Sequence, residues 1–124
     1  MALVLVLDDD AAIRNTLQML FEDEGHTIVT YAKGSDALEY LRHQDTPHVI
    51  FTDYLMPEMM GDEFLRRAQQ ESHTLQHHFI LFAARSLARM PEELVGFLQE
   101  NHIPYIHKPF TIDEILTQVA ASNP

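Results

Sequence analysis

The chain has 124 residues, with 8 basic and 19 acidic side chains, which gives a formal net charge of −11 at pH 7. This length suits one domain, and 46% apolar against 22% charged residues is typical of a globular protein. Because the sequence contains no cysteine, disulfides, thiolate metal sites and cysteine catalysis are excluded. The acidity argues against direct binding of nucleic acid or of an anionic membrane, and it favours cations and basic partner surfaces.

The amino-terminal apolar run is short and leads directly into three aspartates, which is typical of a strand and not of a signal peptide. No later apolar run approaches the ~20 residues that are needed to span a bilayer. We therefore expect a soluble, cytoplasmic protein without a membrane segment. We also expect residues 1–121 to form one domain and residues 122–124 to form a short tail.

Five strand-like segments alternate with five helix-like segments along the chain. Three of the strands are apolar on both faces, as in the centre of a parallel sheet that helices cover on both sides: Leu3–Leu7, Val49–Phe51 and Phe79–Ala83. The other two contain polar residues or begin with proline, so we expect Thr27–Tyr31 and Pro104–His107 at the edges of the sheet.

The intervening helices have recognisable start and stop signals. An apolar stripe between Ile13 and Phe21 predicts a first helix that ends near Gly25. The other helices are expected to begin after Ser35, at Gly61, at Pro91 and at the capping box Thr111–Glu114. The alternation predicts a doubly wound parallel sheet with the strand order 2-1-3-4-5, which binds ligands beyond the carboxyl ends of its first and third strands.

Acidic side chains follow the two strands that this order makes neighbours. Asp8 and Asp9 come directly after the first strand, and Asp53 ends the third. Carboxylates this close raise one another's pKa unless a cation intervenes, and Mg²⁺ needs only a few carboxylates besides its waters. Lys108 follows the last strand, where its ammonium group can hold a phosphoryl group beside the acids. Asp10, directly before a helix, is better explained as its N-cap.

Three segments carry these side chains in a fixed order: Val4–Asp10 with the acid pair, Val49–Gly61 with Asp53, and Tyr105–Phe110 with Lys108. Together they resemble the receiver domain of two-component response regulators. The resemblance covers essentially the whole chain. It implies a flavodoxin-like (βα)5 three-layer sandwich, an α/β fold that agrees with the one expected from the alternation of strands and helices.

The resemblance also implies a role for each site residue. Asp53 is expected to accept a phosphoryl group, as a carboxylate nucleophile, from a histidine kinase or a phosphotransfer protein. Lys108 is expected to contact the phosphoryl oxygens and to form a cis peptide with Pro109. The residues implied as ligands of Mg²⁺, with Mn²⁺ as a substitute, are Asp8, Asp9, Asp53 and, through its backbone carbonyl, Leu55.

A receiver is expected to signal through the face formed by the helix after Pro91, the strand Pro104–His107 and the last helix. The expected recipient is an output partner or a fused effector domain, which the sequence does not name. The chain is expected to assist only its own phosphoryl transfer and dephosphorylation, and not to be an enzyme otherwise. Pairing of two copies as a homodimer through this face is left open.

One position departs from the receiver pattern. Receivers usually carry threonine or serine at the end of the fourth strand, and this chain has Ala83. The missing hydroxyl removes one charge-assisted hydrogen bond, worth roughly 1.5–3 kcal/mol. We therefore expect a weakened coupling between Asp53 and Tyr105, the aromatic residue at the family's switch position. Ser86 is a less favoured substitute for the hydroxyl.

Two other functions remain as alternatives. A receiver-like interaction module that works without phosphorylation is supported by Ala83, whereas the intact acids and Lys108 argue against it. A haloacid-dehalogenase-like phosphohydrolase also begins with an apolar strand and Asp-x-Asp, which Asp8–Asp10 can mimic. Such an enzyme needs a further acid pair at a strand end after the lysine, and this sequence has none there.

The histidines raise the question of a metal site. His73 and His77 have the i, i+4 spacing of neighbours on a helix. They lack the flanking glutamate of a zinc-binding helix, so we expect a surface role for both.

Overall fold

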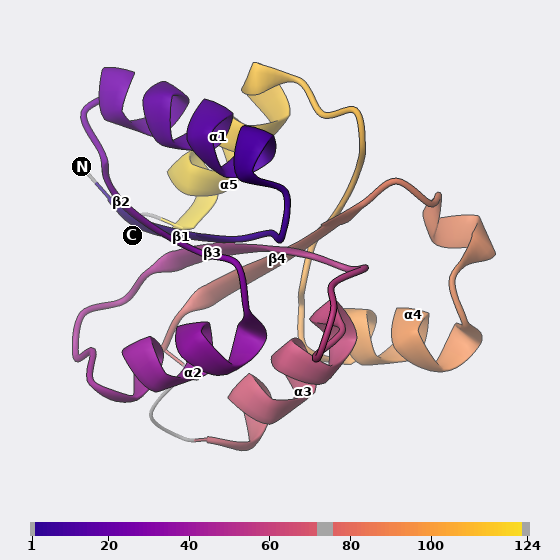
Figure 1. The fold of residues 1–124 in the computed structure, drawn as a ribbon. Coiled ribbons are helices and arrows are strands. Elements are labelled where there is room, and N and C mark those ends of the chain that lie inside the picture. The colour runs from indigo at the N-terminus through magenta and orange to yellow at the C-terminus, as the bar shows by residue number, and fades with distance from the viewer. Residues whose placement is uncertain (1, 72–75, 123–124) are drawn as a thin grey trace.

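The computed structural model describes residues 2–71 and 76–122, in which five parallel strands form one sheet with the order β2-β1-β3-β4-β5 (Figure 1). The strands are β1 (Leu3–Leu7), β2 (Thr27–Tyr31), β3 (Val49–Asp53), β4 (His78–Ala83) and β5 (Tyr105–His107). The helices are α1 (Ala11–Asp23), α2 (Gly34–Arg42), α3 (Gly61–Gln70), α4 (Glu92–Glu100) and α5 (Ile112–Ser122), with a short 3₁₀ helix at Leu87–Arg89. The predicted strand order and the two predicted edge strands are confirmed.

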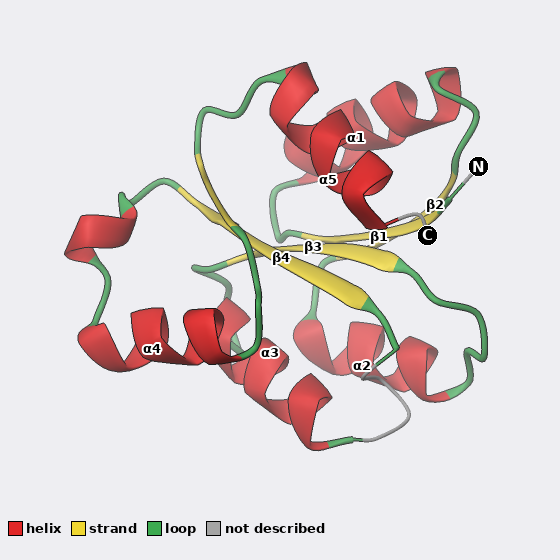
Figure 2. Cartoon of the chain, turned by 180° about the vertical axis from the view of Figure 1, so that it is seen from behind, coloured by secondary structure: helices red, strands yellow, loops and turns green. Residues whose placement is uncertain are grey.

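Helices cover both faces of the sheet and complete the three-layer sandwich. Helices α1 and α5 lie on one face, and α2, α3 and α4 lie on the other, as both views show (Figures 1 and 2). Each face has its own apolar core, because successive side chains of a strand point to opposite sides. None of the helices in residues 2–71 and 76–122 combines the length and the apolar character that crossing a membrane requires.

Strand β3 extends beyond its apolar residues and ends at Asp53, as predicted. All of its residues are buried, and two polar ones continue the ladder with β4, where Thr52 is opposite Leu81 and Asp53 is opposite Phe82. The Thr52 hydroxyl donates a hydrogen bond to the Asp53 backbone carbonyl, 3.0 Å away. Asp53 is therefore the last residue of a central strand, and the pairing of that strand with β4 fixes the position of its backbone.

The predicted helix termini are confirmed where side chains cap them. The Asp10 carboxylate accepts a hydrogen bond of 2.9 Å from the Ala12 backbone N–H at the start of α1. Thr111 and Glu114 each accept the other's backbone N–H at the start of α5, which is the reciprocal pattern of a capping box. Helix α5 ends at Ser122, and residues 123–124 lie outside the described residues, so the division into domain and tail stays a prediction.

The expected surface role of His77 is wrong. His77 is buried, and its Nδ1 accepts a hydrogen bond of 2.8 Å from the His48 backbone N–H. The two imidazole rings meet edge to face with their centroids 5.2 Å apart. His77 thus satisfies a buried backbone donor at the start of β3, which its spacing from other histidines does not indicate. His73 lies outside the described residues.

The His48 side chain predicts a loss of stability in acid. Its Nδ1 lies 2.7 Å from the Thr46 carbonyl oxygen and its Nε2 lies 2.9 Å from the Tyr40 hydroxyl, an arrangement that suits a neutral ring. Burial lowers the pKa of His48 below its usual value. As the pH falls, the His48 ring therefore binds a proton at about pH 6.5 in the unfolded chain and only at a lower pH in the folded protein. This difference lowers the free energy of unfolding in acid.

We expect the free energy of unfolding of the wild type to fall relative to that of His48→Gln as the pH is lowered from about 7.5 to about 5.5. Urea denaturation of both proteins at several pH values measures this difference. Parallel pH profiles of the two proteins would show that the His48 ring keeps its ordinary pKa in the folded protein.

Candidate functional site

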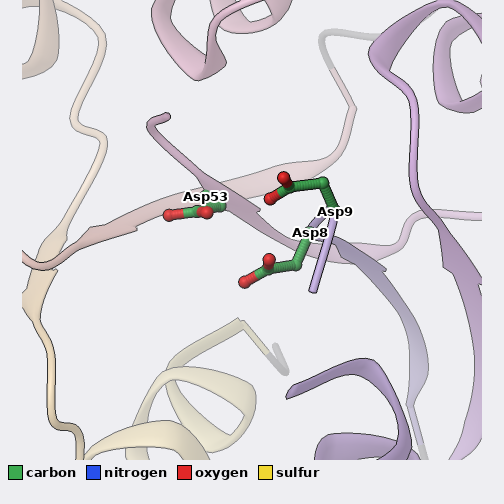
Figure 3. A group of neighbouring side chains, drawn as sticks. All are labelled: Asp8, Asp9 and Asp53. Atoms are coloured by element: carbon green, nitrogen blue, oxygen red, sulfur yellow. The ribbon is translucent and has the colours of Figure 1, made fainter. Parts of the chain in front are cut away.

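Adjacent strands bring three carboxylates together at one edge of the sheet. Leu7 of β1 pairs with Thr52 of β3, so the residues that follow these two positions lie side by side. Figure 3 shows the Asp8, Asp9 and Asp53 side chains at the ends of these two strands. One oxygen from each carboxylate lies within 4.8 Å of the others. The sequence-based expectation of an acidic group at the ends of the first and third strands agrees with this placement.

The environments of the three acids differ. Asp8 is fully buried, Asp53 is 8% exposed and Asp9 is exposed to solvent. One Asp8 oxygen accepts the Asp10 backbone N–H at 2.8 Å. The Asp53 Oδ1 accepts the Tyr54 backbone N–H at 2.9 Å. The local backbone therefore holds the two buried carboxylates in fixed orientations, while Asp9 borders solvent.

The Lys108 ammonium group lies between the two buried acids. Its Nζ is 3.1 Å from an Asp8 oxygen and 3.2 Å from the Asp53 Oδ1, and it lies 4.7 Å from the centre of the Phe82 ring. The Lys108 backbone N–H donates to the Ala83 carbonyl oxygen at 2.7 Å, which extends the pairing of β4 with β5. The peptide between Lys108 and Pro109 is cis, so that prediction is confirmed.

The site holds more negative charge than one ammonium group can neutralise. Burial, followed by repulsion from Asp8, raises the pKa of Asp53 to about 6, although Lys108 acts in the opposite direction. Burial is also the main cause that raises the pKa of Asp8. A hard divalent cation would remove this penalty, and carboxylate oxygens are ligands that Mg²⁺ prefers. The donor set of Asp8, Asp9 and Asp53 therefore fits the expected metal.

A cavity of about 130 Å³ adjoins the Asp53 carboxylate. The residues that line it are Asp53, Tyr54, Leu55, Ala83, Ala84, Arg85 and Lys108. Ala83 is 2% exposed, and it offers a methyl group where the receiver pattern places a hydroxyl. The Leu55 side chain is exposed beside this cavity. We name this space the acceptor cavity.

Tyr105 lies on the edge strand β5 and outside the lining of the acceptor cavity. It is half-buried, it packs against the apolar core on the α4 side of the sheet, and its hydroxyl donates a hydrogen bond to the Arg85 backbone carbonyl. Burial is the main cause that raises the pKa of the Tyr105 hydroxyl. The residue between the acceptor cavity and Tyr105 is thus Arg85, which the sequence analysis did not single out.

Gly61 packs directly against the backbone at the end of β3. Its backbone N–H donates to the Tyr54 carbonyl oxygen at 2.7 Å, which closes the loop between β3 and α3. A Cβ atom at this position would overlap the Asp53 carbonyl oxygen and lie 2.9 Å from the Tyr54 Cα. The close approach could not be predicted from the sequence, where Gly61 marks a helix start and the end of the segment with Asp53, because it depends on how the loop folds back.

Comparison with known proteins places this chain among signalling domains. The family model of the response regulator receiver domain matches residues 4–120. The DNA-binding transcriptional regulator NtrC of Escherichia coli is 33% identical over 117 residues, which are 94% of this chain and 24% of that protein. The probable transcriptional regulatory protein TcrX of Mycobacterium tuberculosis is 30% identical over 118 residues, which are 95% of this chain and 48% of that protein. The chain therefore spans about a quarter to a half of these relatives.

Solved structures with the same fold match nearly the whole chain. The receiver domain of the Francisella response regulator 1452 superposes with a TM-score of 0.81 at 27% identity, over 98% of this chain and 96% of that one. The chemotaxis response regulator CheY4 of Vibrio cholerae gives a TM-score of 0.82 at 24% identity, over 99% of each chain. The second likeness shows the shared fold.

Proposed function

This chain belongs to the response regulator receiver family, and we propose that it accepts a phosphoryl group on Asp53 from a histidine kinase or a phosphotransfer protein in a reaction that requires Mg²⁺. The observation that carries this proposal is the Lys108 ammonium group within 3.2 Å of the buried Asp8 and Asp53 carboxylates, with Asp9 beside them. Because the family model covers residues 4–120, a haloacid-dehalogenase-like phosphohydrolase is no longer proposed.

Asp53 is the proposed nucleophile. Its Oδ1 is held by the Tyr54 N–H and by Lys108, so we assign the attack on phosphorus to Oδ2. The new O–P bond forms as the P–N bond to the donor's phosphohistidine breaks, and the electron pair of that bond stays on the imidazole nitrogen. A carboxylate is a weak nucleophile, so positioning and charge neutralisation supply most of the lowering of the barrier.

Two kinds of positive charge are proposed to neutralise the phosphoryl group. Lys108 pairs with its oxygens once the group occupies the acceptor cavity. The metal, when bound, neutralises the acids and the phosphoryl oxygens. The residues proposed to hold Mg²⁺, or Mn²⁺ in its place, are Asp8, Asp9, Asp53 and, through its backbone carbonyl, Leu55. The proposed receiver unit is residues 1–121.

The phosphorylated domain is proposed to signal through the face formed by α4, β5 and α5. Tyr105 on β5 supports this assignment, since it packs toward α4 and bonds to the loop beside the acceptor cavity. NtrC and TcrX are longer regulators, so the recipient is proposed to be a fused effector domain or a separate output partner. We place the protein in the cytoplasm, with no nucleic acid or membrane bound by this domain and with the same face available for a homodimer.

Uptake of phosphate with and without metal tests the proposal. We expect an acyl phosphate or a phosphorylated histidine donor to add one phosphoryl group in the presence of Mg²⁺, as read by intact mass. Chelation of the metal is expected to reduce the rate at least about tenfold, because the acids then repel the phosphoryl group.

One observation favours a second candidate function. Ala83 removes a phosphoryl ligand that the receiver pattern supplies, and this suits an interaction module that works without phosphorylation. The metal concentration is chosen so that it shifts the melting temperature, which shows that the metal is bound. If the wild type then takes up no phosphoryl group from either donor, the interaction module is favoured and our proposal is overturned.

A further inference from the structure

Phosphorylation would add charge to a cavity that has few cationic partners. A phosphoryl group brings about −1.5 to −2 charges and three acceptor oxygens. Lys108 already pairs with both Asp8 and Asp53. Ala83 offers no donor from its side chain. A further side-chain donor would therefore stabilise the phosphoryl oxygens on Asp53, in addition to the metal.

Arg85 is a basic residue placed to supply this donor. It lines the acceptor cavity together with Asp53 and Lys108, and its side chain is exposed. Of the eight basic side chains, all of which fall within the described residues, Arg85 and Arg89 are the two that make no ion pair or hydrogen bond. The Arg85 guanidinium group is thus uncommitted and can turn toward a new anion.

A second, neighbouring cavity distinguishes Arg85 from Ser86 and Arg89, which lie on the same loop. This second cavity has a volume of about 520 Å³ and is lined by Leu55, Ala84, Arg85, Ser86, Arg89 and His107. Arg85 lines both cavities, whereas Ser86 and Arg89 line only the second. Ser86, considered from the sequence as a substitute for the missing hydroxyl, therefore lines only the cavity that Asp53 and Lys108 do not line.

The Arg85 backbone is connected to the switch position. Its carbonyl oxygen accepts the hydrogen bond from the Tyr105 hydroxyl. A shift of the Arg85 backbone that accompanies movement of its side chain toward Asp53 would therefore strain this bond and change the position of the tyrosine ring. Arg85 thus contacts both places, the acceptor cavity and Tyr105, that the hydroxyl at the position of Ala83 connects in the receiver pattern.

We propose that Arg85 takes the place of the hydroxyl that Ala83 lacks: its guanidinium group binds the phosphoryl oxygens on Asp53, and its backbone transmits the change to Tyr105. This inference rests on the proposed phosphorylation of Asp53. A guanidinium group suits the role because its planar set of donors can bind two phosphoryl oxygens at once.

Beryllofluoride with Mg²⁺, a stable mimic of the phosphoryl group, tests this proposal. We expect Arg85→Gln to weaken beryllofluoride binding at least about tenfold in a titration followed by amide spectra, the loss of one charge-assisted contact. Arg89→Gln is the matched control, since it removes the same charge from the same loop, and its affinity should stay within about twofold of the wild type. Arg85→Lys should give an intermediate loss.

The resonances of the Tyr105 ring report on coupling, because the loss of a positive charge alone would not change their response to beryllofluoride. We expect its resonances to shift when beryllofluoride saturates the wild type, and to shift much less in saturated Arg85→Gln. Adding Ala83→Thr to Arg85→Gln restores a donor at the receiver position, so it should recover both the affinity and the Tyr105 response.

Each failure has a separate meaning. A wild type that does not bind beryllofluoride would overturn the proposed function itself. If the wild type, Arg85→Gln and Arg85→Lys all bind beryllofluoride with the same affinity, the role of Arg85 alone is overturned. An equal loss of affinity in Arg85→Gln and Arg89→Gln would overturn it as well. Because Arg85 is exposed, urea denaturation should show unchanged stability in its variants.

Discussion

Asp53→Asn is expected to abolish phosphoryl uptake and, in the metal-free protein, to raise the free energy of unfolding at neutral pH. Uptake is lost because an amide oxygen is too weak a nucleophile to attack phosphorus. Stability rises because the ionised carboxylate is disfavoured in the fold, where its pKa is raised from 3.8 to about 6. A change of this size corresponds to an energy cost on the order of 3 kcal/mol.

The measured gain should be smaller than this cost, on the order of 1–2 kcal/mol, because Lys108 loses one of its two carboxylate partners. The asparagine Oδ1 keeps the hydrogen bond from the Tyr54 N–H, so the local backbone should not move. Intact mass after incubation with a phosphodonor and urea denaturation without metal measure the two effects.

Asp45→Asn is the matched control, since Asp45 is exposed and lies outside the acidic group. We expect wild-type uptake and stability from it. Labelling of Asp53→Asn at the wild-type rate would show that another residue accepts the phosphoryl group. A loss of stability in this variant would contradict the electrostatic account of the site.

Gly61→Ala is expected to destabilise the protein by about 3 kcal/mol or more and to impair uptake. The new Cβ atom would overlap the Asp53 carbonyl oxygen and crowd the Tyr54 Cα. Both are backbone atoms at the end of β3 and directly after it, so no side-chain rotation can relieve the clash. The strand end would have to shift, and the Asp53 carboxylate would leave its place beside Lys108.

Gly96→Ala provides the matched control within α4, where nothing beyond its chain neighbours and the adjacent helix backbone lies within 4 Å of the new Cβ. This substitution should stabilise the protein by about 0.5–1 kcal/mol, since alanine favours a helix more than glycine does. Urea denaturation and phosphoryl uptake of both variants give the comparison. Equal stability of Gly61→Ala and the wild type would mean that the loop after β3 has room that the structure does not show.

The fold could be predicted because its signals are local. Apolar runs on both faces mark β1, β3 and β4 as central strands, and proline and polar residues mark the two edges. The caps at Asp10 and at Thr111 and Glu114 involve residues two or three positions apart. The end of β3 at Asp53 was predicted, although Thr52 and Asp53 are polar and join the ladder through their pairing with β4.

The candidate site could be predicted where topology alone decides it. Once β1 and β3 are neighbours, Asp8 and Asp53 must lie close together, and a residue at the end of β5 can reach them with a long side chain. The convergence of acids with one lysine already favoured a divalent cation and a phosphoryl group, whereas the role of Asp53 as the phosphoacceptor came from the resemblance to receivers.

Other features depend on contacts between distant parts of the chain. His77 is buried because a backbone donor 29 positions away needs its ring. The lack of space for a Cβ atom at Gly61 arises because the loop after β3 returns against the Asp53 backbone. The two connections of Arg85, to the acceptor cavity and to Tyr105, depend on the path of the loop between β4 and α4, and no periodic pattern fixes that path.

Amide spectra of the wild type with Mg²⁺, recorded before and after addition of beryllofluoride, test the central claim most directly. If Asp8, Asp9, Asp53 and Lys108 surround one phosphoryl position, the largest shifts will fall on these residues and on the loops after β3 and β4. An unchanged spectrum, or shifts centred on His48 and His77 at the opposite end of the sheet, would contradict it.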